Sequence, residues 1–239
     1  MKKHIPNTIT CCNLISGCIA TFWAFLGSYE LALLFIVIGA VFDFFDGMSA
    51  RLLGVSSPIG KELDSLADDI TFGFAPSAMV FSLLNSPSAV TILPLSIVPC
   101  AWFIASCVPY VAFVMAAFSA LRLAKFNLDE RQALGFIGLP TPANALFWGA
   151  LIVGAGEWLQ QYVALTLCLL ALSCWLLVSE VPMFALKFKH WGWKGNEVKY
   201  VFLLTSIVLI AFFRIPGIAI VIAWYVVLSI LTNYLNKKQ

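Results

Sequence analysis

The chain has 239 residues, of which 62% are hydrophobic and only 11% are charged, and its mean hydropathy is +0.96. A soluble domain of this length does not need so much apolar material, whereas a bundle of membrane helices does. The formal net charge of +2 is too small to indicate a nucleic-acid partner. The composition therefore predicts an all-α, polytopic membrane helical bundle in contact with membrane lipids.

Eight apolar runs are long enough to cross a bilayer, which takes about 20 residues. They cover residues 8–28, 31–51, 62–85, 103–125, 142–158, 161–180, 198–213 and 216–235. The stretch 87–102 is also apolar, but Pro87, Pro94 and Pro99 interrupt it, so we expect it to be re-entrant or interfacial. We predict a single domain over residues 1–239, with a six-helix catalytic core at about 5–180 and two additional helices at 198–235.

The basic residues predict how the bundle is oriented. With the N-terminus inside, thirteen of the fourteen Lys and Arg residues fall in cytoplasmic segments, and only Arg214 faces out. The connection between the second and third runs then lies at the cytoplasmic surface. We therefore expect a multi-pass protein of the inner (cytoplasmic) membrane whose polar site faces the cytoplasm.

Acidic residues gather in the second and third runs, where an ionised carboxylate is costly and needs a compensating partner. At 100° per residue, one face of the second run carries carboxylates beside residues with almost no side chain. The third run repeats this arrangement at four-residue spacing. The residues on the two faces are Asp43, Asp46, Gly47 and Ala50, followed by Gly60, Asp64 and Asp68.

Two such faces that meet would form an oxygen-rich site suited to Mg²⁺, Mn²⁺ or Ca²⁺ and poorly suited to zinc. Arg51, just beyond the first face, offers a forked donor for a phosphate oxygen. These residue types predict a two-metal site for phosphoryl or phosphatidyl transfer. A cation or proton transporter stays open as an alternative, because membrane acids also line transport pathways.

The spacing also carries a resemblance. The pattern Asp43-x2-Asp46-Gly47-x2-Ala50-Arg51-x8-Gly60-x3-Asp64-x3-Asp68 resembles the signature of the CDP-alcohol phosphotransferases. Members of that family are polytopic membrane enzymes, usually homodimers, that displace CMP from a CDP-linked alcohol with a second alcohol. The resemblance implies a homodimer with two divalent cations, Mg²⁺ or Mn²⁺, and with Ca²⁺ as an alternative occupant.

The resemblance further implies a role for each matched position. Asp43 and Asp64 correspond to the aspartates that bridge both metals, and Asp46 completes one metal site. Asp68 contacts the other metal and acts as the general base on the acceptor hydroxyl, while Asp69 lies outside the pattern. The expected contacts to CDP-diacylglycerol are Asn7, Thr10, Gly47, Ala50, Arg51, Ser57 and Gly60.

Three further stretches resemble the membrane-type phosphatidylserine synthases, whose donor is CDP-diacylglycerol and whose acceptor is L-serine. They are DDITFGFAPS (68–77), ALRLAKFN (120–127) and FIGLPTPAN (136–144). A zwitterionic acceptor needs a cation for its carboxylate, so the expected acceptor contacts are Arg122, Lys125 and Asn127. Two alternatives remain: the acceptor is a glycerophosphate or an inositol phosphate, or Arg122 and Lys125 only mark the inner membrane boundary.

Overall fold

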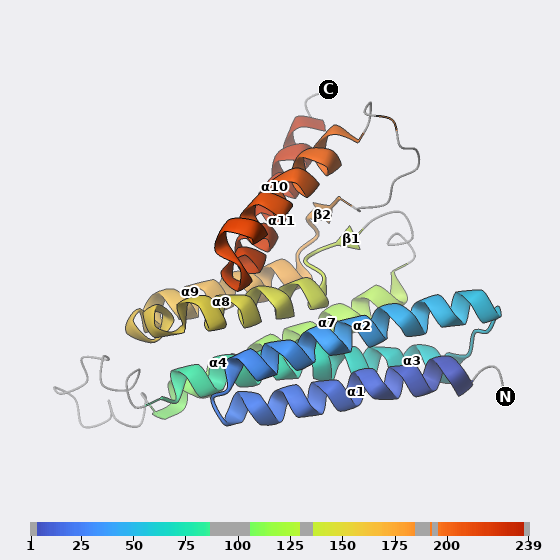
Figure 1. Cartoon of the computed structure of the whole chain (residues 1–239), viewed down its shortest axis with the longest axis horizontal. Helices are drawn as coiled ribbons and strands as arrows, with labels where there is room; N and C mark the ends of the chain where they lie inside the picture. Colours follow the sequence, from blue (N-terminus) through green and yellow to red (C-terminus); the bar gives the residue numbers. More distant parts are fainter. Residues whose placement is uncertain (1–3, 87–105, 130–135, 185–191, 193–195, 237–239) are drawn as a thin grey trace.

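The computed structural model describes residues 4–86, 106–129, 136–184, 192 and 196–236 (Figure 1). The stretch 87–102, expected to be re-entrant or interfacial, lies outside the described residues. The long helices are α1 (His4–Phe25), α2 (Tyr29–Leu53), α3 (Pro58–Asp68), α4 (Ala75–Leu84), α7 (Val114–Leu128), α8 (Thr141–Gln161), α9 (Val163–Val178), α10 (Glu197–Phe213) and α11 (Ile215–Asn236).

Short elements join or flank these helices. A π-helical turn, η1 (Asp69–Phe74), joins α3 to α4, and a 3-10 turn, η2 (Val108–Phe113), precedes α7. The two-residue strands β1 (Phe136–Ile137) and β2 (Pro182–Met183) pair antiparallel. The all-α prediction is confirmed, and each predicted run overlaps a helix. The run 62–85 differs in one respect, because it is divided into α3, η1 and α4 instead of forming one regular α-helix.

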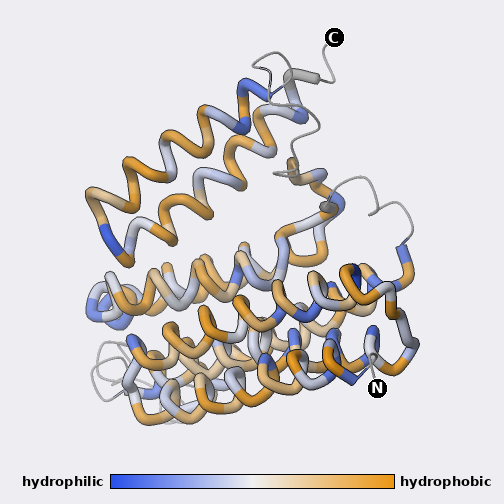
Figure 2. The backbone as a smooth tube through the Cα atoms, turned by 45° about the vertical axis from the view of Figure 1, so that its right-hand side comes forward, coloured by the Kyte–Doolittle hydropathy of each residue, from blue (hydrophilic) through white to orange (hydrophobic). Residues whose placement is uncertain are grey.

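The apolar lengths and surfaces are those of an integral membrane protein. Within the described residues, four segments are long and apolar enough to cross a membrane, namely His4–Phe25, Tyr29–Leu53, Val108–Leu128 and Ile215–Tyr234, and Val163–Val178 is a shorter apolar helix. Figure 2 shows hydrophobic residues along most of the length of the helices. Large apolar side chains such as Phe22, Phe44 and Ile207 are exposed, as expected for a surface that faces lipid tails.

Helix α8 lies at the centre of the packing. It contacts α2, α4 and η1 on one side and α9 and α11 on the other. Its Trp148 is fully buried and donates from Nε1 to Ser173 Oγ on α9 at 3.1 Å. The hairpin of α10 and α11 packs onto α8 through α11 and rises obliquely from the other helices (Figure 1).

Glycines let α1 and α2 approach η1 closely. A Cβ added at Gly39 would lie 2.5 Å from Thr71 Cγ2 and 2.9 Å from Asn13 Oδ1, and one added at Gly17 would collide with Thr71 Oγ1. Thr71 Oγ1 donates to the backbone carbonyl of Asn13 at 3.0 Å. The two N-terminal helices therefore clamp the turn that follows the last aspartate of the motif.

We predict that Gly39→Ala destabilises the protein by about 1–3 kcal/mol, because the added methyl overpacks the contact with η1. Thermal unfolding in detergent measures the effect. Gly156→Ala is the matched control, since its added methyl meets only Leu83 Cδ1 at 3.5 Å. Equal shifts in the two variants would contradict the proposed clamp.

Candidate active site

A tight connection turns the two aspartate-bearing faces toward each other. Helix α2 ends at Gly54, whose φ of 61° is left-handed, and the N–H groups of Gly54 and Val55 donate to the carbonyls of Arg51 and Ala50 at 3.3 and 3.1 Å. Ser57 then caps α3, because its Oγ accepts from Gly60 N at 3.0 Å, and a proline occupies the first turn. Local sequence signals thus bring the two halves of the motif together.

Three of the four predicted metal ligands form one cluster. Asp43, Asp64 and Asp68 each place a carboxylate oxygen within 4.8 Å of the others. All three are half-buried, and Oδ1 of Asp64 is buried without a hydrogen-bond partner in the described structure. A set of oxygen ligands with unmet acceptors and a large negative charge fits a hard divalent cation such as Mg²⁺ or Mn²⁺.

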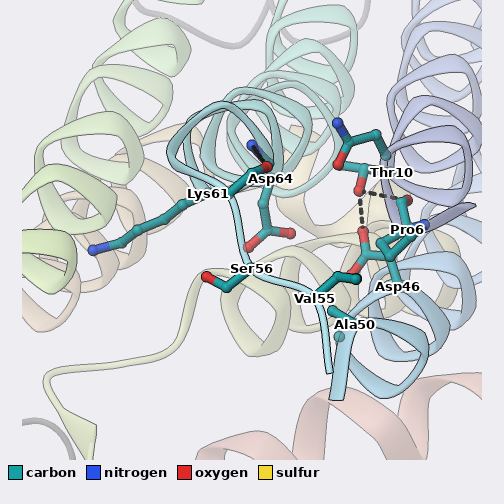
Figure 3. Close-up of a pocket in the computed structure, with 12 residues that line it drawn as sticks. Pro6, Thr10, Asp46, Ala50, Val55, Ser56, Lys61 and Asp64 are labelled. Atoms are coloured by element: carbon teal, nitrogen blue, oxygen red, sulfur yellow. Dashed lines mark hydrogen bonds between the residues drawn. The ribbon is translucent and has the colours of Figure 1, made fainter. Parts of the chain in front are cut away.

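The fourth predicted ligand, Asp46, lies beside this cluster and not within it. Its side chain is 6% exposed, and Oδ2 accepts a hydrogen bond of 2.6 Å from Thr10 Oγ1 on α1. Figure 3 shows Asp46 and Asp64 directed into the same cavity from α2 and α3. Asp46 also interacts electrostatically with Asp64, so the four carboxylates share one region.

The cavity has a volume of about 260 Å³ and lies between α1, α2 and α3. Its walls contain every residue predicted to contact CDP-diacylglycerol except Arg51. Beside Gly47 the space is open, since an added Cβ would find its nearest neighbour, Arg51, 3.8 Å away. The lining residues are Pro6, Asn7, Thr10, Asp46, Gly47, Ala50, Val55, Ser56, Ser57, Gly60, Lys61 and Asp64.

Two basic residues, Arg51 and Lys61, lie at this cavity and have different hydrogen-bond partners. Arg51 is exposed and donates from Nε to the Gly47 carbonyl at 2.9 Å, which holds it beside the cavity. Lys61 lines the cavity, and its Nζ donates to the Asn127 carbonyl on α7 at 3.1 Å. Sequence reasoning missed Lys61, although a basic residue directly after the motif's Gly60 is a usable signal.

Asn13 is a second residue that sequence reasoning missed. It is fully buried on α1, and its Nδ2 donates to Asp68 Oδ1 at 3.1 Å. Pro6, Thr10 and Asn13 are spaced by four and three residues, so they share one helix face. The spacing places Asn13 on this face, but no local signal in the sequence pairs it with Asp68.

The predicted acceptor contacts lie on α7 but have different environments. Arg122 is 7% exposed, approaches Thr141 Oγ1 at 3.5 Å and lies near enough to Asp68 to interact electrostatically. This burial argues against a role as a mere marker of the membrane boundary. Lys125 is exposed, whereas Asn127 Nδ2 donates to Ser65 Oγ at 2.7 Å and ties α7 to α3.

Comparison with known proteins agrees with this geometry. Residues 3–231 match the family model described as CDP-alcohol phosphatidyltransferase. The chain therefore belongs to the CDP-alcohol phosphatidyltransferase family, a family of enzymes.

Several curated relatives share one name. The CDP-diacylglycerol--serine O-phosphatidyltransferase of Bacillus subtilis (strain 168) is 39% identical over 140 residues, which are 59% of this chain and 70% of the relative. The protein of that name from Methanocaldococcus jannaschii is 30% identical over 177 residues, 74% of this chain and 72% of the relative. The one from Mycobacterium leprae is 30% identical over 192 residues, 75% of this chain but only 57% of the relative.

We predict that Asp64→Asn weakens Mn²⁺ binding by at least about tenfold, because it removes a charged oxygen whose only available partner is a cation. Titration of the purified protein with Mn²⁺, followed by the electron paramagnetic resonance signal of the free ion, measures the affinity. Glu62→Gln, an exposed acid on the same helix, is the control and should bind Mn²⁺ normally. Unchanged affinity in Asp64→Asn would remove Asp64 from the metal site.

Proposed function

We propose that the chain transfers the phosphatidyl group of CDP-diacylglycerol to the hydroxyl of L-serine, giving phosphatidylserine and CMP. The observation that carries the proposal is the carboxylate cluster of Asp43, Asp64 and Asp68 beside a cavity lined by the small residues of the motif. The shared name of the relatives supports serine as the acceptor. Family membership favours an enzyme over a transporter.

The cavity between α1, α2 and α3 is the proposed site for the cytidine and diphosphate of the donor. Gly47, Ala50 and Gly60 leave room for the nucleotide, and Arg51 beside the cavity supplies positive charge at the diphosphate. Asp43, Asp46, Asp64 and Asp68 are the proposed ligands of two divalent cations, Mg²⁺ or Mn²⁺. When bound, these ions neutralise the diphosphate and stabilise the charge on the departing CMP.

Asp68 is the proposed general base. The serine hydroxyl oxygen forms the new bond to phosphorus, the bond from phosphorus to the CMP oxygen breaks, and the hydroxyl proton passes to Asp68. A carboxylate is a weak base toward an alcohol, so the proton leaves as the oxygen–phosphorus bond forms. Asn13 donates to Asp68 Oδ1 and so fixes the orientation of this carboxylate.

Arg122 is the proposed partner of the serine carboxylate. Its guanidinium is buried, lies near Asp68 and approaches only one hydroxyl, that of Thr141, within the described residues. The distribution of basic residues supports a site that faces the cytoplasm from the inner membrane. By the family resemblance, we also infer a homodimer.

CMP release by the purified protein tests this function. With CDP-diacylglycerol and Mn²⁺ in detergent, we expect CMP release that depends on L-serine, because serine supplies the attacking hydroxyl. Asp68→Asn and a chelator should each abolish the release, and Glu62→Gln should retain it. Release with glycerophosphate or inositol phosphate but not with serine would keep the reaction class and reject the acceptor. Ion flux in sealed vesicles without CMP release with any acceptor would favour the transporter.

A further inference from the structure

Asp69 faces away from the carboxylate cluster, although it directly follows Asp68. Consecutive residues of a helix point about 100° apart, and Asp68 is directed toward Asn13 on α1. The Asp69 carboxylate instead lies toward α7. From the position of a Cβ added at Gly73, Asp69 Oδ1 is 2.7 Å away, Ser119 Cβ is 2.9 Å away and Ser119 Oγ is 3.5 Å away. Asp69 thus belongs to a different surface, formed where η1 meets α7.

Buried polar groups without partners lie on α7 and α8, two helices that contact η1. Ser119 on α7 and Asn144 on α8 are fully buried, and neither the Ser119 hydroxyl nor either amide atom of Asn144 has a hydrogen-bond partner in the described part of the chain. The same holds for Arg122 Nε, one turn beyond Ser119, and for Asp69 Oδ1. Buried polar groups are nearly always paired in native proteins, so such a concentration indicates a bound polar molecule.

Along α7 and along α8, the groups of each helix lie within one turn of each other, and both helices contact η1. Arg122 approaches Thr141, the first residue of α8, at 3.5 Å, and Ser119 and Asn144 lie one helical turn deeper. The loop before α8 is fixed by Gly138, whose φ is 73° and whose N–H donates to the Val181 carbonyl at 2.9 Å. This hydrogen bond fixes the loop that leads into Thr141, the residue that Arg122 approaches.

A second cavity leads to Arg122. It has a volume of about 410 Å³ and is lined by Arg122, Lys125, Ser179 and Glu180, among other residues. It shares no lining residue with the cavity between α1, α2 and α3. Side chains of both signs line it, which suits a small molecule that carries a positive and a negative group.

We propose that Asp69, Ser119, Arg122 and Asn144 form the seat of an α-amino-acid acceptor, which reaches it through the second cavity. Arg122 binds the carboxylate, Asp69 binds the ammonium, and Ser119 and Asn144 complete the hydrogen bonds. Arg122 interacts electrostatically with Asp68, so an acceptor bound to Arg122 lies near the proposed general base. This inference rests on the proposed function and adds the residues that distinguish serine from other alcohols.

Acceptor analogues test the seat. 3-Hydroxypropanoate lacks the ammonium of serine, and ethanolamine lacks its carboxylate. In CMP-release assays, Asp69→Asn should raise the KM for serine by about tenfold or more and leave the inhibition constant of 3-hydroxypropanoate against serine unchanged. Arg122→Gln should also raise the KM for serine, but it should leave the inhibition constant of ethanolamine unchanged.

Substitutions at Asn144, Ser119 and Ser229 distinguish a loss of serine binding from a loss of packing. Asn144→Leu should raise the KM for serine without raising the KM for CDP-diacylglycerol, and it should also raise the thermal midpoint, because it removes an unpaired buried amide. Ser119→Ala should raise the KM for serine. Ser229→Ala is its control, since Ser229 on α11 is likewise a buried serine but lies beside Tyr225, outside the proposed seat.

Two outcomes would overturn the seat. One is an unchanged KM for serine in Asp69→Asn, and the other is a parallel change for serine and 3-hydroxypropanoate. Failure of the proposed function would look different, because the unmodified protein would then release no CMP with serine.

Discussion

Mutual repulsion of carboxylates in an apolar helical bundle is the constraint on which the rest of the structure depends. Two unit charges 4 Å apart repel by about 4 kcal/mol even at an effective dielectric constant of 20, and Asp43, Asp64 and Asp68 lie within 4.8 Å of one another. Such a cluster is stable only with cations or protons between the carboxylates. The tight connection through Gly54 and Ser57 holds the two helices in this unfavourable arrangement, and the clamp at Gly39 fixes the turn behind them. The fold therefore brings carboxylates together where bound cations or protons must balance their charge.

The proposed function places donor, chemistry and acceptor on different helices. Helices α1, α2 and α3 enclose the cavity proposed for the nucleotide, and Asp46 and Asp64 line it. On the other side, α7 and α8 present buried polar groups toward η1. Asp68 and Asp69 lie where these two regions meet. Asp68 is directed toward α1, whereas Asp69 is directed toward α7. The π-helical turn begins at this point, and such turns are frequent at functional sites. Among the described helices, α11 packs mainly against α8 and α10.

The sequence was sufficient for the helices and for the aspartates that form the carboxylate cluster, because hydropathy and spacing are local properties. It was not sufficient for contacts between distant helices. Asn13 reaches Asp68 across 55 positions, and nothing local distinguishes it from any other polar residue of α1. The boundary between α3 and η1 was missed because the hydrophobic pattern runs on without interruption. Arg122 could be predicted as a cation but not as a buried one, since its burial depends on how α8 packs against α7.

The most direct test of this account is the state of bound manganese in the purified protein. Electron paramagnetic resonance at saturating Mn²⁺, with the bound metal counted per chain, reports both stoichiometry and the coupling between ions. The account predicts two ions per chain with the coupled spectrum of a dimanganese pair, lost together in Asp43→Asn, because Asp43 is the proposed bridge. Two uncoupled ions, or a single ion that survives this substitution, would contradict the shared carboxylate site.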